Sequence, residues 1–430
     1  MADTRPIRFL VLFAAFVLFL SCSSAPPATL TTCSLDQIPP GARLTKAQLR
    51  DWSAIWAFVN REYVDPGFRG IDWASAKESV ASRIETGLDN ATFTALMDET
   101  LSQFKDYHTH YVSPETVRAD TASAKTQGFT GVGMSFRRGA GDYIVVVTVF
   151  PGPAYRAGIM GHDRILAVDG LSPLDARGEP DTSRFRGPAG TPVRLLLASA
   201  SGGTREITLL REQIAQDAID AGLVASRLLP LERTNGRRIG YALLQGMSLQ
   251  EADRLRAEFA RLSADAPLDG FILDLRVNAG GELDAVASCL GLFYEGRTGK
   301  LAQRNGATIK LPMLGKAVGN SRTLPLVVLV HGTTHSAGEL LAGALQHAGR
   351  ASLVGGRTAG DTGNQKEAKL PGGGYINVTG GVFVLPDGSD PGWLWRGIEP
   401  DFAIPGCGWD EFTDEDDPAL AKAIEILFQK

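Results

Sequence analysis

Residues 326–361, LVVLVHGTTHSAGELLAGALQHAGRASLVGGRTAGD, decide the fold class of this chain. A short β-branched apolar run is followed by a turn of small residues and then by apolar residues at helical spacing, a pattern that predicts a strand, a tight turn and a helix. Ser336 lies at the turn. The backbone N–H groups that follow it, Ala337 first, have no partner inside the helix and can face a developing oxyanion. The stretch therefore predicts a strand–turn–helix unit in which Ser336 has the geometry of a nucleophile.

A second interpretation makes Ser336 only the cap of the helix that follows it. Glu339 stands three residues later, and this spacing is typical of a capping box. The spacing alone favours the cap over the nucleophile, because capping serines are common. The local pattern leaves both interpretations open.

The surrounding residues resemble a known family. Residues 334–350, THSAGELLAGALQHAGR, resemble the signature S-A-S-A-S-E-I-x-A-x-A-L-Q-x-x-G-R of the carboxyl-terminal processing (tail-specific) serine peptidases. The form T-x-S-A-G-E is similar to the tricorn-like and retinoid-binding-protein-like branch of that family. The resemblance places the nucleophile on Ser336 and implies a crotonase-like catalytic domain, expected at residues 225–405. It covers nearly all of the chain after the N-terminal residues.

A glycine-rich turn is the expected second half of the oxyanion site. Residues 271–293, FILDLRVNAGGELDAVASCLGLF, contain a match to the family motif D-L-R-x-N-x-G-G. Glycine lets the backbone approach a ligand closely. The resemblance therefore implies that Gly280 or Gly281 supplies an oxyanion N–H beside that of Ala337. A plain strand-to-helix turn is the alternative.

Residues 125–213 are expected to form a β-rich module that resembles a PDZ domain. The loop 128–136 matches the peptide-carboxylate loop, and AGIMGHDRILAVDG at 157–170 matches the central signature of the module. Such modules bind an extended peptide as an added strand. A degenerate copy that only packs on the catalytic domain is the alternative. The residues that the match assigns to peptide binding are Gly131, Val132 and Gly133.

The N-terminal helical region, expected at residues 45–120, bears on the general base. It ends in DYHTHY at 106–111, which is similar to the family motif D-x-H-T-x-Y. Family members with a Ser–Lys dyad carry the lysine in G-K-G-x-V-Q, but Asp361 replaces it here. The tricorn-like branch uses a histidine from the D-x-H-T region, which corresponds to His108, and histidine titrates near neutrality. Lysine-dyad relatives also carry D-x-H-T, so a structural role for His108 stays open.

Other groups near the motifs fit the family pattern poorly. Lys366 and Lys369 are out of register with the dyad lysine, and His335 is expected to point away from Ser336, its neighbour in the chain. The glutamate of the tricorn-like branch has no counterpart, because residues 392–396 are GWLWR.

The N-terminus has the layout of a secretory leader. Arg5 and Arg8 precede the apolar run FLVLFAAFVLFL, and Ser21-Cys22-Ser23-Ser24 follows. We expect residues 1–22 to be a lipoprotein-type signal peptide and Cys22 the lipidated N-terminus, with 23–44 as a tether. A plain signal peptide or an uncleaved anchor is the alternative. The expected location is periplasmic, with a lipid anchor in the outer membrane.

Composition limits the remaining possibilities. The net charge is −5, which gives no reason to expect nucleic-acid binding. The four cysteines show no metal-ligand spacing, so we expect no metal and no cofactor; Cys289 fits a core position, and Cys33 could pair with Cys407 in an oxidising compartment. Residues 406–430 are expected to form an acidic, solvated tail.

Together these features predict a multidomain α/β protein with a helical region, a PDZ-like module and a crotonase-like catalytic domain. The expected function is that of a serine-type peptidase that acts on envelope proteins or peptides, recognised at their C-termini. The alternative is an inactive, peptide-binding member of the family, because the usual lysine is absent. The sequence does not indicate the oligomeric state.

Overall fold

The fold is taken from a computed structural model, which describes residues 40–429 apart from 125–128, 140, 176–177, 179, 201, 217, 220–223, 313 and 414. Cys22 and Cys33 lie outside these residues, so the expected lipidation stays a prediction and the possible pairing of Cys33 with Cys407 is not tested; Cys407 itself is buried. No helix in the described part of the chain is long and apolar enough to cross a membrane.

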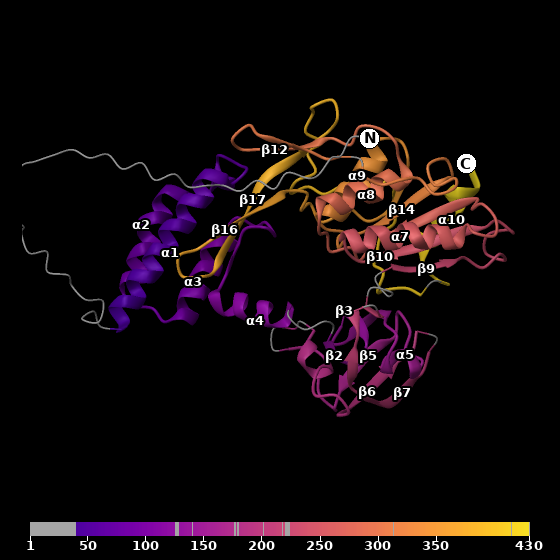
Figure 1. Cartoon of the computed structure of the whole chain (residues 1–430), viewed down its shortest axis with the longest axis horizontal. Coiled ribbons are helices and arrows are strands. Elements are labelled where there is room, and N and C mark those ends of the chain that lie inside the picture. The colour runs from indigo at the N-terminus through magenta and orange to yellow at the C-terminus, as the bar shows by residue number, and fades with distance from the viewer. Residues whose placement is uncertain are drawn as a thin grey trace, which may run out of the picture.

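A six-stranded sheet forms the centre of the C-terminal half (Figure 1). Its strands lie in the spatial order β18–β15–β14–β11–β10–β9, and all neighbours are parallel except β9 and β10. Every residue of β10, β11 and β14 is buried. Parallel strands covered on both faces need no polar alternation, which explains their almost continuous apolar sequences. The bounds are β9 Val224–Leu228, β10 Ile239–Leu244, β11 Gly270–Asp274, β14 Leu326–Val330, β15 Ser352–Gly355 and β18 Phe402–Ala403.

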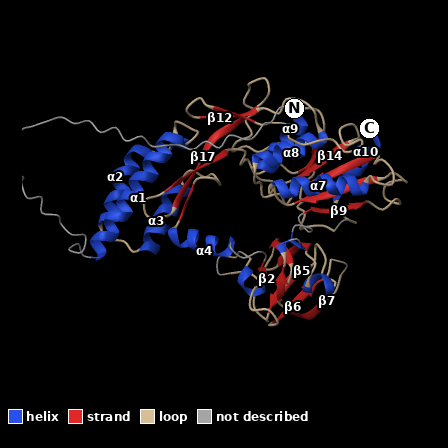
Figure 2. Ribbon diagram, in the orientation of Figure 1, coloured by secondary structure: helices blue, strands red, loops and turns tan. Residues whose placement is uncertain are grey.

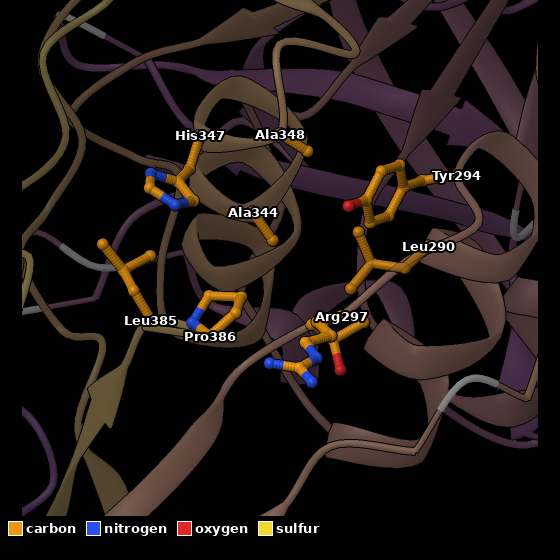
Figure 3. Close-up of a pocket in the computed structure, with 9 residues that line it drawn as sticks. Leu290, Tyr294, Arg297, Ala344, His347, Ala348, Leu385 and Pro386 are labelled. Atoms are coloured by element: carbon orange, nitrogen blue, oxygen red, sulfur yellow. The ribbon is translucent and has the colours of Figure 1, made fainter. Parts of the chain in front are cut away.

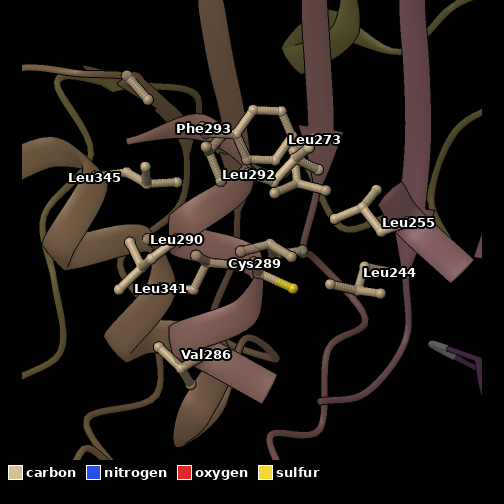
Figure 4. Packing of buried hydrophobic residues seen from close by; sticks show 14 of the residues in the cluster. Leu244, Leu255, Leu273, Val286, Cys289, Leu290, Leu292, Phe293, Leu341 and Leu345 are labelled. Carbon is tan, nitrogen blue, oxygen red and sulfur yellow. The ribbon is translucent and has the colours of Figure 1, made fainter. Parts of the chain in front are cut away.

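Helices cover both faces of this sheet. One face carries α7 (Leu249–Leu262), α8 (Leu283–Phe293) and α9 (Ala337–His347), whose apolar side chains meet in one core (Figure 4). Cys289 lies in that core, where burial raises the pKa of its thiol to about 12, as expected for an inert thiol. The other face packs on α10 (Pro418–Gln429). The predicted strand, turn and helix around Ser336 are confirmed as β14 and α9.

The N-terminal helices pack on a second sheet, in the order β1–β17–β12–β13 with β16 also paired to β17. Figure 1 shows β16 and β17 running from these helices toward α9. Aromatic contacts fill the core, including the rings of Trp52 and Trp73 at 5.6 Å. The bounds are α1 Pro40–Glu62, η2 Phe68–Gly70, α2 Trp73–Glu85, α3 Asn90–Ser102, β1 His110–Val112, α4 Pro114–Ala124, β12 Lys300–Gln303, β13 Thr308–Lys310, β16 Asn364–Lys369 and β17 Tyr375–Val384.

A β-rich module with its own apolar core follows the N-terminal helices in the chain and lies below the central sheet in the view of Figure 2. Five antiparallel strands follow the order β3–β4–β5–β6–β7, so β3 is an edge strand, and β2 pairs separately with β8. The bounds are β2 Phe129–Gly131, β3 Met134–Arg138, β4 Ile144–Val149, α5 Pro153–Arg156, β5 Arg164–Val168, η3 Thr182–Phe185, β6 Pro192–Ala198, β7 Thr204–Leu210 and β8 Glu212–Ile214. The mixed α/β fold is thus confirmed in outline.

The C-terminal segment corrects the prediction of a solvated tail over residues 406–430. Trp409 is 3% exposed, and α10 buries one face against the central sheet. Leu420, Ile424 and Leu427 recur at helical spacing and form that face. The prediction relied on the acidic residues before α10 and overlooked this apolar stripe. One of those acidic residues, Asp417, is buried and forms an ion pair with an arginine.

That arginine is Arg276, which is fully buried next to the nucleophile-bearing loops. Its Nη2 lies 2.6 Å from carboxylate oxygens of both Asp274 and Asp417, and its Nη1 donates to the carbonyl oxygen of Cys407 at 3.1 Å. The contact ties the start of α10 to the end of β11, because Asp417 also accepts the N–H groups of the first turn of α10.

Replacing Asp417 with alanine should destabilise the protein by about 2 kcal/mol, because the buried Arg276 loses one of its two carboxylate partners and the first N–H groups of α10 lose their acceptor. Urea unfolding followed by tryptophan fluorescence measures this. Glu115→Gln, which breaks the exposed pair of Glu115 with Arg118, is the control and should have little effect. Equal unfolding midpoints for the two variants would contradict the prediction.

Candidate active site

Four loops meet at the carboxyl ends of the parallel strands β10, β11, β14 and β15. The N–H of Ala279 donates to the carbonyl oxygen of Gln245 at 2.9 Å, and that of His335 donates to Asn278 at 2.9 Å. The N–H of Ala359 reaches the next loop, at the carbonyl oxygen of Thr334. This edge is where open α/β sheets bind their ligands.

Ser336 lies at this edge in a strained conformation. Its φ is 50° and its ψ is −118°, a left-handed geometry that is costly for a residue other than glycine. It precedes α9 and forms a capping box with Glu339, as the cap interpretation requires. Strain of this kind is typical of functional sites, so the cap does not account for the whole geometry of this residue.

The carboxylate of Glu339 holds this turn in place. Glu339 is fully buried; its Oε2 accepts the N–H groups of Ser336 at 3.0 Å and of Asp361 at 2.7 Å. Its Oε1 accepts the Thr358 hydroxyl and the Gly360 N–H. Burial raises the pKa of Glu339, while these four donors act in the opposite direction. Glu339 therefore joins the nucleophile turn to the loop after β15, a role beyond the predicted cap.

The glycine turn after β11 packs directly on the nucleophile. A Cβ at Gly280 would stand 2.7 Å from the Ser336 Cβ, so only glycine fits there. The N–H of Gly280 is donated to Asn278 Oδ1 at 2.9 Å and is thus not free for a substrate. Within the described residues, the N–H groups of Gly281 and Ala337 have no acceptor. Of the three predicted oxyanion residues, these two keep an available donor.

Two histidines lie close to the nucleophile turn. The Nδ1 of His335 is 2.6 Å from Asp361 Oδ2, so this ring is held by the residue that replaces the family lysine. The ring of Tyr107 lies 5.6 Å from that of His335 and 5.9 Å from that of His108. The structure therefore brings the D-x-H-T segment beside the His335–Asp361 pair.

His108 is buried, with 6% of its surface exposed. Burial lowers the pKa of its imidazole, although the nearby carboxylates of Asp361 and Asp106 raise it. The ring is consequently neutral at pH 7, the state in which an imidazole accepts a proton.

Asp106 anchors the segment that carries His108. Its carboxylate accepts hydrogen bonds from the Tyr63 hydroxyl at 2.8 Å, the Thr109 N–H at 2.8 Å and the Thr379 hydroxyl at 3.0 Å. The strand β1 that follows pairs with β17. The helical region and the second sheet therefore fix residues 106–111 jointly.

The lysines near the family motif are engaged elsewhere. Lys366 Nζ lies 2.6 Å from Glu62 Oε2 on α1, and this contact lowers the pKa of the Glu62 carboxyl. No hydrogen bond joins a lysine to Ser336 in the described part of the chain. The loop 392–397 packs on Gly360 through the Trp395 N–H, and Glu399 pairs with Arg357, so neither supplies a carboxylate to the site.

The residues predicted for peptide binding lie in the β-rich module. Gly131 ends β2, Val132 is buried, and Gly133 has a φ of 81°. Neither Val132 nor Gly133 donates its N–H to an acceptor among the described residues.

No three described His, Cys, Asp or Glu side chains form a group suited to a metal ion. A pocket lined by Leu290, Tyr294 and His347 lies at the C-terminal ends of α8 and α9 (Figure 3). It is one helix length, about 16 Å, from Ser336, and so belongs to a different part of the surface.

The site can be compared with known proteins. Residues 238–404 match the family described as peptidase family S41. The carboxyl-terminal-processing protease of Picosynechococcus is 30% identical over 380 residues, which cover 87% of this chain and 88% of that protein. The protein of the same name from Synechocystis is 30% identical over 378 residues, with 86% and 85% covered.

Solved structures agree. The photosystem II D1 C-terminal processing protease is 26% identical, with a TM-score of 0.55 over 87% of this chain and 97% of that one. The tricorn protease has the same TM-score at 17% identity, which shows a similar fold. The chain belongs to peptidase family S41, whose carboxyl-terminal-processing members are serine peptidases. The predicted family and enzyme class are confirmed.

Replacing Glu339 with glutamine should lower kcat/KM by about 100-fold. The side-chain NH2 group cannot accept the hydrogen bonds that one carboxylate oxygen accepts now, so the Ser336 turn would lose its support. Hydrolysis of an unfolded protein substrate measures this. The matched control is Glu251→Gln, since Glu251 occupies the same capping position on α7 and accepts the Ser248 N–H at 2.8 Å. Equal losses in both variants would show that only helix stability had changed.

Proposed function

We propose that this protein hydrolyses peptide bonds near the C-termini of exported proteins or peptides, through an acyl-enzyme on Ser336. The observation that carries the proposal is the strained Ser336 beside the N–H groups of Ala337 and Gly281, which have no acceptor among the described residues. The names of the carboxyl-terminal-processing relatives support the choice of substrate region.

In the proposed reaction the Ser336 Oγ attacks the scissile carbonyl carbon as a histidine takes the hydroxyl proton. The two backbone N–H groups stabilise the oxyanion that forms. When the C–N bond breaks, the histidine returns the proton to the leaving amine. Water then hydrolyses the ester by the same proton transfers and restores Ser336.

We assign the general base to His108. Its burial favours the neutral imidazole, and its segment lies beside the nucleophile turn. Lys366 is paired with Glu62, so it does not compete for this role. The alternative of an inactive, peptide-binding protein requires that no base acts on Ser336.

Ser336→Ala should abolish hydrolysis, and His108→Ala should lower kcat/KM by about 100-fold or more because the serine proton loses its acceptor. His110→Ala is the matched control, since His110 lies in the same segment but contacts Asn377. It should stay within a few-fold of wild type, as should Lys366→Ala. A fluorophosphonate probe reports the nucleophile separately. A wild-type protein no more reactive than Ser336→Ala would favour the inactive alternative.

The acid limb of kcat/KM should lie below the ordinary histidine pKa of about 6.5. Burial lowers the pKa of His108, so the neutral base persists to lower pH, and activity is lost as pH falls through that lowered value. A pH profile of peptide hydrolysis measures this. A limb above pH 7 would contradict the assignment.

We further propose that the β-rich module is PDZ-like and binds the substrate C-terminus. The edge strand β3 can accept an added strand, and the N–H groups of Val132 and Gly133 can hold a carboxylate. An apolar free-acid peptide should then bind at least about tenfold more tightly than its amide, because charged hydrogen bonds are lost with the amide. Fluorescence titration of the Ser336→Ala protein measures both. Equal affinities would refute the carboxylate site.

A further inference from the structure

The carboxylate of Asp361 makes a short contact that has no role in the reaction proposed above. Its Oδ2 lies 2.6 Å from His335 Nδ1, and the side chains of Asp361 and His335 are 14% and 30% exposed. A hydrogen bond to a carboxylate at this distance places the proton on Nδ1. In this tautomer the acceptor nitrogen of the His335 ring is Nε2.

Asp361 is fixed to the nucleophile turn through its backbone. The N–H groups of Asp361 and Ser336 both donate to Glu339 Oε2, at 2.7 and 3.0 Å. One buried oxygen therefore sets the position of the Asp361 carboxylate relative to the nucleophile.

The same carboxylate acts on His108. Burial of the His108 ring disfavours its charged form; the charges of Asp361 and Asp106 favour it, and those of His110 and His335 oppose it. An imidazolium formed in a poorly solvated site is stabilised by a nearby negative charge.

The other carboxylates of the site are already committed. Both oxygens of Glu339 accept two donors each, and those of Asp106 accept hydrogen bonds from Tyr63, Thr109 and Thr379. Among the described residues, the side chain of Asp361 forms a hydrogen bond only with His335. It is thus the carboxylate with capacity to respond to a new positive charge.

From these contacts we propose that Asp361 is a positioning residue of the peptidase reaction. It orients His335 through Nδ1 and stabilises the imidazolium that forms when His108 takes the Ser336 proton. The inference rests on the proposed function. It assigns a role to the aspartate that stands where the family lysine is expected.

The first test uses Ser336→Ala protein, in which no turnover occurs, and compares Asp361 with Asp361→Asn by NMR. In the parent, ¹⁵N shifts should show the Nδ1–H form of His335 with a strongly downfield proton. In Asp361→Asn that proton should move upfield, and the titration midpoint of His108 should fall by about one pH unit. The His347 resonances, at the far end of α9, serve as an internal control.

The second test measures kcat/KM against pH in the otherwise native enzyme. Asp361→Asn should lower the plateau by at least about tenfold and move the acid limb to lower pH, whereas Asp361→Glu should recover part of the rate. Asp390→Asn, at an exposed carboxylate on a neighbouring loop, is the control and should match wild type.

The outcomes separate the two proposals. A lower plateau with an unmoved limb and unchanged His335 and His108 resonances would overturn the role of Asp361, because only packing would have changed. A second outcome is that Asp361→Asn shifts the His335 and His108 resonances as expected, while the wild-type protein neither hydrolyses peptides nor reacts with fluorophosphonate. This outcome would refute the proposed function and leave the electrostatic role of Asp361 standing.

Discussion

The buried carboxylate of Glu339 is the contact on which the site depends. It accepts four donors from two segments, the turn before α9 and the loop after β15. Four hydrogen bonds to one buried charge stabilise a backbone conformation that Ser336 would otherwise avoid. The strain at Ser336 is therefore offset by the side chain of Glu339 in the first turn of α9, the helix that begins directly after the strained residue.

The parts of the fold with a clear period were predictable from the sequence. The strand before Ser336 and the helix after it follow from an apolar run and a helical repeat, and the glycine turn at Gly280 follows from a motif in which only glycine fits. The helix α10 was missed because acidic residues precede it, although Leu420, Ile424 and Leu427 already have helical spacing.

The polar contacts of the site were less predictable, because they join segments with no periodic relation. Glu339 has the position of a cap, but nothing in the sequence shows that residues 358–361 fold back onto it. Asp361 was recognisable as a missing lysine and not as the partner of His335. The N–H of Gly280 is occupied by the side chain of Asn278, whereas that of Gly281 has no acceptor among the described residues. This difference is visible only in three dimensions.

The pairing of β1 with β17 has a consequence for when the protein can act. The ribosome makes the segment with His108 early and Ser336 much later. Residues 106–111 are held by Thr379 and by the strand β17, and these are synthesised after Ser336. On the proposed assignment, a nascent chain that has already folded its helices and its β-rich module still lacks an assembled proton acceptor. On this assignment the site is complete only once β17 has been synthesised and has paired with β1.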